Sequence, residues 1–416
     1  MSPRLVSWCF ILTVLPLAAA APVVSTSATA RAFHDSNLFL QQPMPLAAGQ
    51  TTDGTPRSED ALGLDASVAL AAVWKVPGRT AELSYTPQIF RYVDHASENH
   101  TDHALAAGFA TVGGPWSADV KGRLLYVDGS RVAPVFNGLG GSPAMGGEPV
   151  RGRREQSILR ASGKVARAWE RGFARGIFSS FDQRFHTSQA TGTGYCNYAD
   201  RNETSVGAEV GWTQRARWTW IGAVRAGYQR QADVLGVATN YSNDFVRYLA
   251  GFEFNAASTL KLSVLAGRDS RRFGESCRAG YDRSTTTGYG EIAATWTPTK
   301  QDTATLSGKR YLWMPGTGRG MYVDSLVELG WKRKWSAVWT TGVTGRLHAG
   351  DTSHFNAWAP RRDRIYTAGA VASRTCANGL RVDLELTRDI AVSILDRTPG
   401  REYTRTIVAM GVGRTW

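Results

Sequence analysis

The chain has 416 residues, and its 48 Lys and Arg residues against 35 Asp and Glu residues give it a formal charge of +13. Hydrophobic residues make up 43% of the sequence, which excludes wholesale disorder. The four widely spaced cysteines exclude a disulfide-stapled scaffold and a cysteine-rich zinc module. The basic balance alone fits nucleic acid, anionic lipid or an anionic solute as the partner.

Residues 1–20 predict an export signal peptide. Arg4 precedes an apolar run from Leu5 to Leu17, and the alanines that follow fit a cleavage site near Ala20. The alternative is an N-terminal anchor helix, which the shortness of the run disfavours. Export argues against nucleic acid as a partner. No later stretch approaches the roughly 18 apolar residues of a spanning helix, so the mature chain is either soluble or crosses a membrane as strands.

After the signal, segments of roughly 10 to 14 residues alternate apolar side chains with small or polar ones. The clearest case is 116–127, where Trp116, Val120, Leu124 and Tyr126 share one parity and charged residues occupy the other. A strand places these two sets on opposite faces. The same alternation recurs over 204–212, 218–228, 321–331, 335–347 and 380–390.

The aromatic positions separate a membrane barrel from a soluble sandwich. In two segments the apolar face begins with a tryptophan and ends with a tyrosine, from Trp116 to Tyr126 and from Trp218 to Tyr228. Ten strand steps of about 3.3 Å, tilted by roughly 40°, span about 25 Å, which is the height of the apolar band of an outer-membrane barrel. Aromatic residues at both edges of that band are interfacial girdles, whereas a sandwich buries its tryptophans in mid-strand.

The pattern predicts an all-β fold, a transmembrane antiparallel up-and-down β-barrel of about 18 strands over residues 21–416. Short turns alternate with longer polar links, as in bacterial barrels with short periplasmic turns. We expect crossings near 30–41, 61–75, 79–93, 103–113, 116–128, 157–170, 172–186, 203–215, 217–230, 244–255, 258–271, 286–297, 302–314, 321–333, 335–349, 363–375, 379–393 and 402–416. If the first crossing is absent, 16 strands is the alternative.

The last residues, 408–416, alternate apolar side chains and close on Trp416. This ending resembles the C-terminal recognition signal of outer-membrane barrels, which implies the barrel-assembly machinery as a partner. Arg414 departs from the signal, since an apolar residue is usual there, although an arginine at the membrane edge can extend its charge into water.

The opening of the chain carries a second resemblance. Its residues are Asp35-Ser36-Asn37-Leu38-Phe39, Ser58-Glu59-Asp60, Leu83-Ser84-Tyr85-Thr86-Pro87, Arg91-Tyr92, Asn99-His100 and His103. They resemble the opening of the bacterial outer-membrane porins of the beta-barrel porin 2 type, over roughly the first quarter of the chain. The resemblance implies the outer membrane of a Gram-negative-type bacterium, with outer-membrane lipid and lipopolysaccharide around the barrel. It also implies a porin-like role or one associated with polysaccharide export.

No motif predicts an enzyme. The seven histidines include a cluster of His95, His100 and His103, but residues at a flexible rim seldom hold the geometry of a metal site. Ser353 and His354 are adjacent, but no Asp or Glu lies at a spacing that would complete a catalytic triad, so a triad is not indicated. We therefore expect no catalytic residue, no metal and no cofactor.

The charged parity of the strands gives the pore-lining candidates. They are Lys121, Arg123, Arg160, Lys164, Arg225, Arg247, Asp324, Glu328, Asp383 and Glu385. Basic residues dominate the strands from 116 to 261, and the four acidic candidates form a sector toward the C-terminus. Two interpretations stay open: cross-strand ion pairs that hold the wall together, and a transverse field that orients a dipolar or anionic solute.

The longest outer link after the N-terminal one is the loop 129–156, which is rich in glycine and carries Arg131, Arg151, Arg153 and Arg154. A long loop without secondary structure is usually functional or disordered. Folded inward, the loop would place these arginines opposite the acidic sector and form a constriction. The alternative is a mobile loop that lies over the rim.

Two cysteines, Cys196 and Cys277, fall in different outer links in an oxidising location, where disulfides persist. We expect them to pair, with two unpaired loop thiols as the alternative.

The function that this sequence favours is an outer-membrane porin-like channel for small polar or anionic solutes, with anion preference from the basic lumen. Two alternatives share the same wall: a barrel associated with polysaccharide export, and a non-conducting surface-interaction barrel.

Overall fold

The computed structural model describes residues 21–38, 40, 58–130, 154–187, 199–215, 217–233, 240–256, 259–277, 282–314, 321–352, 362–393 and 402–416. The expected signal peptide, residues 1–20, lies outside this part of the chain, and so does most of the loop 129–156. Within the described part, no helix is long and apolar enough to span a membrane.

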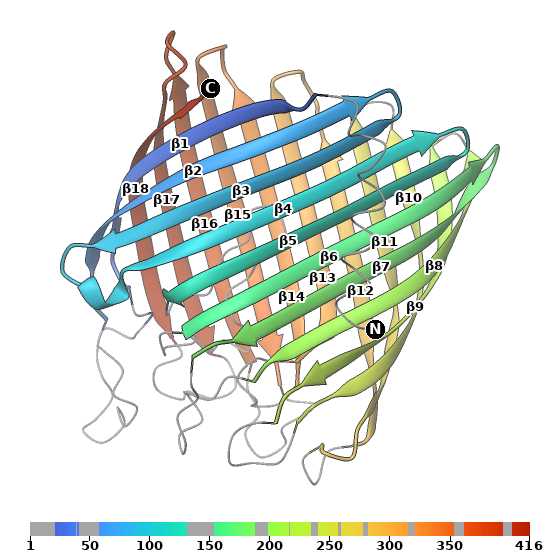
Figure 1. Cartoon of the computed structure of the whole chain (residues 1–416). Coiled ribbons are helices and arrows are strands. Elements are labelled where there is room, and N and C mark those ends of the chain that lie inside the picture. Colours follow the sequence, from blue (N-terminus) through green and yellow to red (C-terminus); the bar gives the residue numbers. More distant parts are fainter. Residues whose placement is uncertain are drawn as a thin grey trace.

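In the described part of the chain, eighteen strands form one closed antiparallel sheet (Figure 1). Each strand pairs with its neighbours in sequence, and β1 closes the barrel by pairing with both β2 and β18. The strands are β1 Val23–Asp35, β2 Ala61–Val76, β3 Arg79–Tyr92, β4 His100–Gly113, β5 Trp116–Ser130, β6 Arg154–Trp169, β7 Gly172–Phe185, β8 Arg201–Arg215, β9 Trp218–Gln231, β10 Asn243–Ala256, β11 Leu260–Phe273, β12 Ser284–Trp296, β13 Asp302–Trp313, β14 Tyr322–Lys334, β15 Trp339–Asp351, β16 Arg362–Thr375, β17 Arg381–Ser393 and β18 Tyr403–Thr415. The expected 18-strand barrel is confirmed, and the 16-strand alternative is wrong.

The first crossing is displaced from its expected position. The sequence pattern favoured 30–41, whereas β1 covers Val23–Asp35 and pairs along its whole length with β2. Most of β1 consists of valine, alanine, serine and threonine, so its two faces differ little in polarity and their alternation is weak. The strand ends where the Asn37 amide donates to the Asp35 carboxylate at 3.0 Å, which turns the chain.

The outer surface of the barrel is apolar. Side chains such as Leu384 and Met410 are 56% and 61% exposed, and they alternate with inward-facing polar residues. At the end with short turns, exposed tryptophans including Trp116, Trp169 and Trp212 form a ring, and exposed tyrosines lie toward the other end. An apolar band between aromatic girdles is the lipid-facing surface of a transmembrane barrel. The chain is therefore a β-barrel of the bacterial outer membrane.

The links at the two ends of the barrel differ in length (Figure 1). The short turns lie at the end where the chain terminates, which in bacterial barrels faces the periplasm. In the turn between β2 and β3, Gly78 has a φ of +72°, and an added Cβ would lie 2.6 Å from the Val112 carbonyl oxygen. The Val112 amide also donates to the Gly78 carbonyl at 2.7 Å. Only glycine fits this turn without strain.

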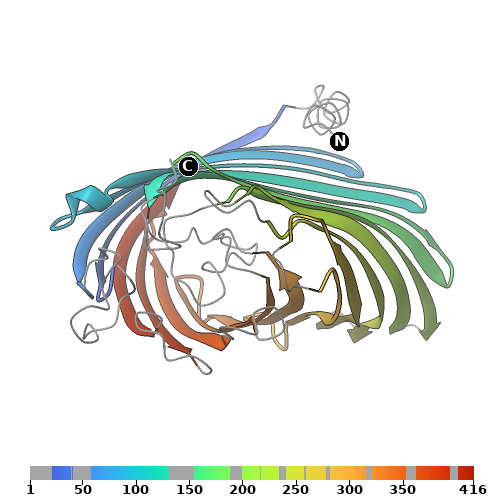
Figure 2. The same ribbon diagram turned by 90° about the horizontal axis from the view of Figure 1, so that it is seen from below.

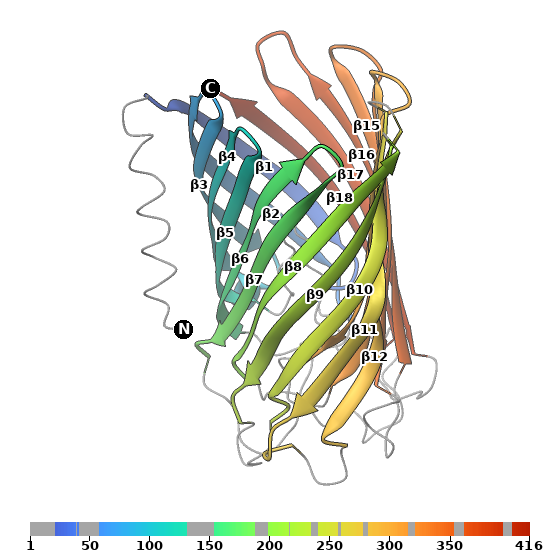
Figure 3. The ribbon, with the colours of Figure 1, turned by 90° about the vertical axis from the view of Figure 1, so that its right-hand side faces the viewer.

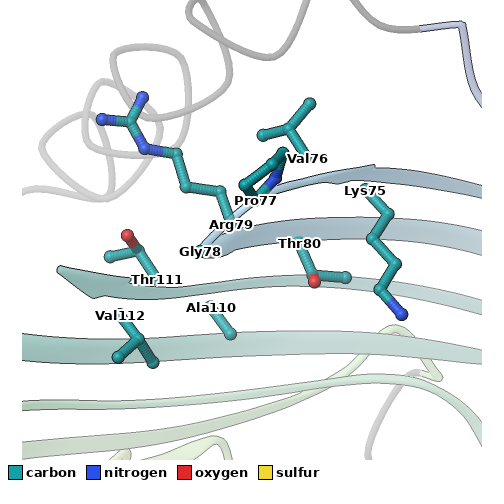
Figure 4. A pocket seen from close by; sticks show the side chains of 9 residues that line it. All are labelled: Lys75, Val76, Pro77, Gly78, Arg79, Thr80, Ala110, Thr111 and Val112. Atoms are coloured by element: carbon teal, nitrogen blue, oxygen red, sulfur yellow. The ribbon is translucent and has the colours of Figure 1, made fainter.

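A pocket of about 490 Å³ lies beside the same turn (Figure 4). Its lining comes from the ends of β2, β3 and β4 and includes Lys75, Arg79 and Thr111. The figure shows Lys75 and Arg79 extending in different directions, so the two charges do not converge on one ligand. This pocket is a feature of the barrel edge, and the interior is the better candidate for function.

Candidate functional site

All ten pore-lining candidates face inward. On β5, Arg123 alternates with the exposed Leu124, and on β17, Glu385 alternates with the exposed Leu384 and Leu386. The same parity places Lys121 on β5, Arg160 and Lys164 on β6, Arg225 on β9, Arg247 on β10, Asp324 and Glu328 on β14, and Asp383 on β17. The surroundings of these ten side chains differ, and the differences determine which charges a solute could meet.

One group of charges forms an alternating chain across β7–β12. Arg175 lies 2.6 Å from Glu209, and Glu209 lies 2.9 Å from Arg225. Arg225 continues the chain to Glu291 at 3.0 Å, and Lys309 of β13 lies 3.8 Å from the same carboxylate. Because every charge has opposite charges beside it, this chain neutralises itself.

A second chain lies nearer the outer end. Arg247 contacts Glu203 at 3.4 Å and Asp269 at 3.0 Å, and Arg271 contacts Asp269 at 2.8 Å. The side chains of Arg271 and Asp269 are fully buried. Arg271 also donates to the Leu312 carbonyl oxygen at 2.7 Å. For Arg225 and Arg247, then, the structure favours the ion-pair interpretation.

Near the outer end, a contact crosses the barrel interior. The rings of Phe181 on β7 and Trp313 on β13 lie 5.2 Å apart, edge to face. The guanidinium of Arg201 lies 5.4 Å from the Phe181 ring and 4.7 Å from the Trp313 ring, and it donates to the Met314 carbonyl oxygen. Five strands, β8 to β12, separate β7 from β13 in the sheet. These side chains therefore partition the interior.

We call the interior between β7 and β13 the packed lobe, because the two ion-pair chains extend across it. The rest of the interior holds a cavity of about 1260 Å³, which we call the open lobe. Its described lining comes from β1 and β3–β5 on one wall and from β13–β18 on the other. Figure 2, an end-on view, shows the strands of the first half of the chain opposite those of the second half.

The open lobe has a polar lining with more basic than acidic groups. Five basic residues line it (Arg31, Lys332, Lys334, Arg381 and Arg405), together with three acidic ones (Asp35, Asp102 and Glu385). Hydroxyls of Thr303, Thr305, Thr340, Thr344, Ser373 and Thr387 fill much of the remainder. In the part of the chain that the structure describes, Lys332 and Lys334 make no ion pair. Both lie at the periplasmic end of β14.

The acidic candidates of the C-terminal sector are mostly held by basic partners. Asp324 accepts a hydrogen bond from the buried His348 at 2.7 Å if the ring nitrogen is protonated. Asp383 contacts Arg381 at 2.8 Å, and Glu385 contacts Arg31 at 2.8 Å. Glu328 faces Arg346 across the β14–β15 pair.

The basic candidates on β5 and β6 form the wall beside the open lobe. Lys121 lies 3.7 Å from Asp119, and Arg123 is paired in register with Arg160. Arg160 lies over the Phe181 ring at 5.3 Å, next to the partition. Lys164 makes no ion pair with any described residue.

Sequence reasoning missed several residues of the interior. Arg175, Arg201 and Arg271 belong to the inward parity of their strands, and that parity was the signal that could have identified them. The expected β11 crossing ended at residue 271, and β11 ends at Phe273.

Some predicted residues lie outside the described part of the chain: Arg131, Arg151, Arg153 and Cys196. Arg154 begins β6 and is buried, and Cys277 packs against an apolar cluster that includes Phe273 and Met321. The constriction and the Cys196–Cys277 disulfide stay predictions. Among the described residues, no group of three or more His, Cys, Asp or Glu side chains could hold a metal ion.

No family model matches the sequence, and a search of curated proteins finds no match. The resemblance to porins of the beta-barrel porin 2 type thus stays a resemblance. Solved structures similar to this chain include OpdK from Pseudomonas aeruginosa, at 11% identity and a TM-score of 0.45 over 95% of this chain and 99% of that chain. OccK2 from the same organism, solved with glucuronate, has 12% identity and a TM-score of 0.44 over 94% and 98%. A BenF-like porin from Pseudomonas fluorescens has 12% identity and a TM-score of 0.43 over 94% and 99%.

Proposed function

We propose that this outer-membrane barrel is a porin-like channel, and that the open lobe is its pathway for small polar or anionic solutes. The observation that carries the proposal is the cavity of about 1260 Å³ on the lumen side of β13–β18, with five basic residues against three acidic ones in its lining. Large barrels can enclose an aqueous channel, and the charges that line it set its selectivity.

The hydroxyl-rich lining supports a hydrated solute. Threonine and serine side chains exchange hydrogen bonds with water or with a polar solute at little cost, whereas an apolar lining would repel both. Lys332 and Lys334 add positive charge that no described carboxylate neutralises. A solute with a carboxylate or phosphate would gain from passing them.

The packed lobe contributes little to selectivity. Its ion-pair chains hold five basic residues (Arg175, Arg225, Arg247, Arg271 and Lys309) and five acidic ones (Glu203, Glu209, Glu253, Asp269 and Glu291). Their sum is neutral. Among the described residues, anion preference therefore has to come from the open lobe and from the basic wall of β5 and β6 beside it.

Single-channel recording in a planar bilayer tests this proposal. We expect a steady open level and, in a salt gradient, a reversal potential that shows preference for anions. Cation preference would mean that Asp35, Asp102 and Glu385 dominate the pathway. Silence from folded, inserted protein would favour the export-associated barrel or the non-conducting surface barrel.

A further inference from the structure

Three arginines lie on the lipid-facing side of β11 and β13, the two strands that flank β12: Arg268 and Arg272 on β11 and Arg310 on β13. All three are exposed, and they belong to the outward parity of their strands. They occupy the half of the barrel away from the short turns, on the β10–β12 side that Figure 3 turns toward the viewer. We call this surface the β11–β13 patch.

None of the three arginines has an ion pair with the described residues. Arg310 donates a hydrogen bond to the Ser325 hydroxyl at 3.2 Å. Arg230, an outward arginine on β9, instead lies 2.6 Å from Asp244. The patch thus presents uncompensated positive charge to the membrane.

The strand between the arginines leaves room for a ligand. Arg268 is paired in register with Gly288 of β12, and Arg310 with Gly290, so glycine lies beside each arginine. A Cβ added at Gly288 would meet nothing within 4 Å. Gly288 and Gly290 are two residues apart along β12, so two strand spacings of about 4.8 Å and an offset of about 7 Å place the arginine backbones about 12 Å apart across this glycine floor.

Hydroxyls continue the patch from the glycine floor toward Arg272. Ser270 and Thr286 face outward and lie 3.2 Å apart, oxygen to oxygen. A ligand over the floor would therefore meet guanidinium donors on two sides and hydroxyls above. Arginine matches the geometry of phosphate oxygens, and its charge-assisted hydrogen bonds to them are strong.

The depth of Arg268 favours a counter-charge. It lies five residues before the end of β11 at Phe273, which is about 17 Å along the strand at about 3.3 Å per residue. At a tilt of roughly 40°, this places Arg268 about 13 Å below the outer rim, where a charge on the lipid face costs more than at the interface. A phosphate drawn to the same level would offset that cost.

Outward charge on the opposite side of the barrel is mostly acidic, although Arg184 lies 3.3 Å from Asp182 there. At the outer ends of β5, β6 and β7, Asp128, Glu155 and Asp182 share the outward parity. An anionic headgroup is repelled there and attracted to the β11–β13 patch.

We propose that the β11–β13 patch binds the phosphorylated headgroup of an outer-leaflet lipid, which in this membrane is lipopolysaccharide. Arg268 and Arg310 hold the phosphate over the glycine floor, and Arg272 binds at the rim. The lipid binds the outer surface of the barrel at β11–β13 and does not enter the lumen.

Native mass spectrometry of the detergent-solubilised barrel with bisphosphorylated lipid A tests the proposal. The variant combines Arg268→Gln, Arg272→Gln and Arg310→Gln. Its matched control combines Arg79→Gln, Arg167→Gln and Arg374→Gln, three outward arginines at the periplasmic rim. We expect the patch variant to bind lipid A weaker by about tenfold or more and the control to stay within about twofold of the native barrel. Lipid A without phosphates should bind the native barrel as weakly as the patch variant does.

Each opposite result overturns the proposal. Equal loss in the control would indicate unspecific attraction to positive charge, and equal binding of lipid A without phosphates would indicate apolar contact alone. Inorganic phosphate that binds at the patch as well as lipid A would make it a site for a soluble anion. If the triple variant fails to fold, as judged by its heat-dependent gel mobility, the single variant Arg310→Gln replaces it in the same comparison.

Discussion

At the scale of single residues, Arg201 and Trp313 decide how much of the barrel is open. The guanidinium lies 4.7 Å from the indole, and both belong to the contact that joins β7 to β13. A cation next to an aromatic face gains when water is excluded, so this contact suits the barrel interior.

Trp313→Ala tests the partition. We expect the two lobes to join near the outer end, so that single-channel conductance rises, while lost packing lowers the stability of the barrel by up to about 3–5 kcal/mol. Trp339→Ala, at an exposed tryptophan of the rim, is the matched control. A folded Trp313→Ala barrel with native conductance would show that the contact does not limit flow.

Two lysines in the open lobe test the origin of selectivity. Replacing Lys332 and Lys334 with glutamine removes two positive charges that no described carboxylate compensates, and we expect the reversal potential in a salt gradient to move toward zero. Lys261→Gln is the control, since Lys261 faces inward on β11 and is absent from the described cavity lining. An unchanged reversal potential in the double variant would show that other residues cause the selectivity.

The sequence identifies which residues face inward, but not which of them a solute meets. Parity alone places Arg225 and Arg247 on the inner face. Besides partners on adjacent strands, their neutralisation involves Glu291 and Glu203, which lie two or three strands away around the wall. Partners at that range are determined by the curvature of the closed barrel and by the reach of the side chains. The two-residue alternation of the sequence gives no information on either.

At the scale of elements, the strand bounds could be predicted to within a few residues wherever alternation was strong and glycine or proline marked the turns. β5 and β9 match closely because aromatic residues define both ends of their lipid-facing sides. β1 could not be predicted in the same way. Its small residues form backbone pairs with β2 and β18, but the two faces of the strand differ little in polarity, so the sequence shows no clear alternation.

The loop 129–156 is the element whose position we expect to affect conductance most. If it folds into the open lobe, its arginines narrow the pathway, and deleting Gly138 to Gly147 should raise conductance and relax ion preference. Deleting the same number of residues from the link at 41–57 is the control. Native conductance in a folded deletion variant would place the loop outside the pathway.

At the scale of the whole molecule, the formal charge of +13 does not measure the charge that a solute meets. The ion-pair chains cancel within the packed lobe, and outward arginines face lipid. Among the described residues, what remains for the pathway is the small basic excess in the lining of the open lobe and the basic wall of β5 and β6 beside it. A few fixed charges spread along a hydrated wall act on ions through space, without dehydrating them.

Selectivity of that kind depends on ionic strength. The Debye length falls from about 10 Å at 0.1 M salt to about 3 Å at 1 M, so fixed charges on the wall stop reaching the middle of the pathway at high salt. We expect reversal potentials at one fixed gradient ratio to show clear anion preference at low absolute concentration and little at high concentration. Preference that is independent of salt would instead indicate direct contact at a narrow site, such as the pair of Arg31 and Glu385, whose oppositely charged atoms lie 2.8 Å apart. The Lys332→Gln, Lys334→Gln double variant should then keep its preference, whereas under the field mechanism it loses preference at every concentration.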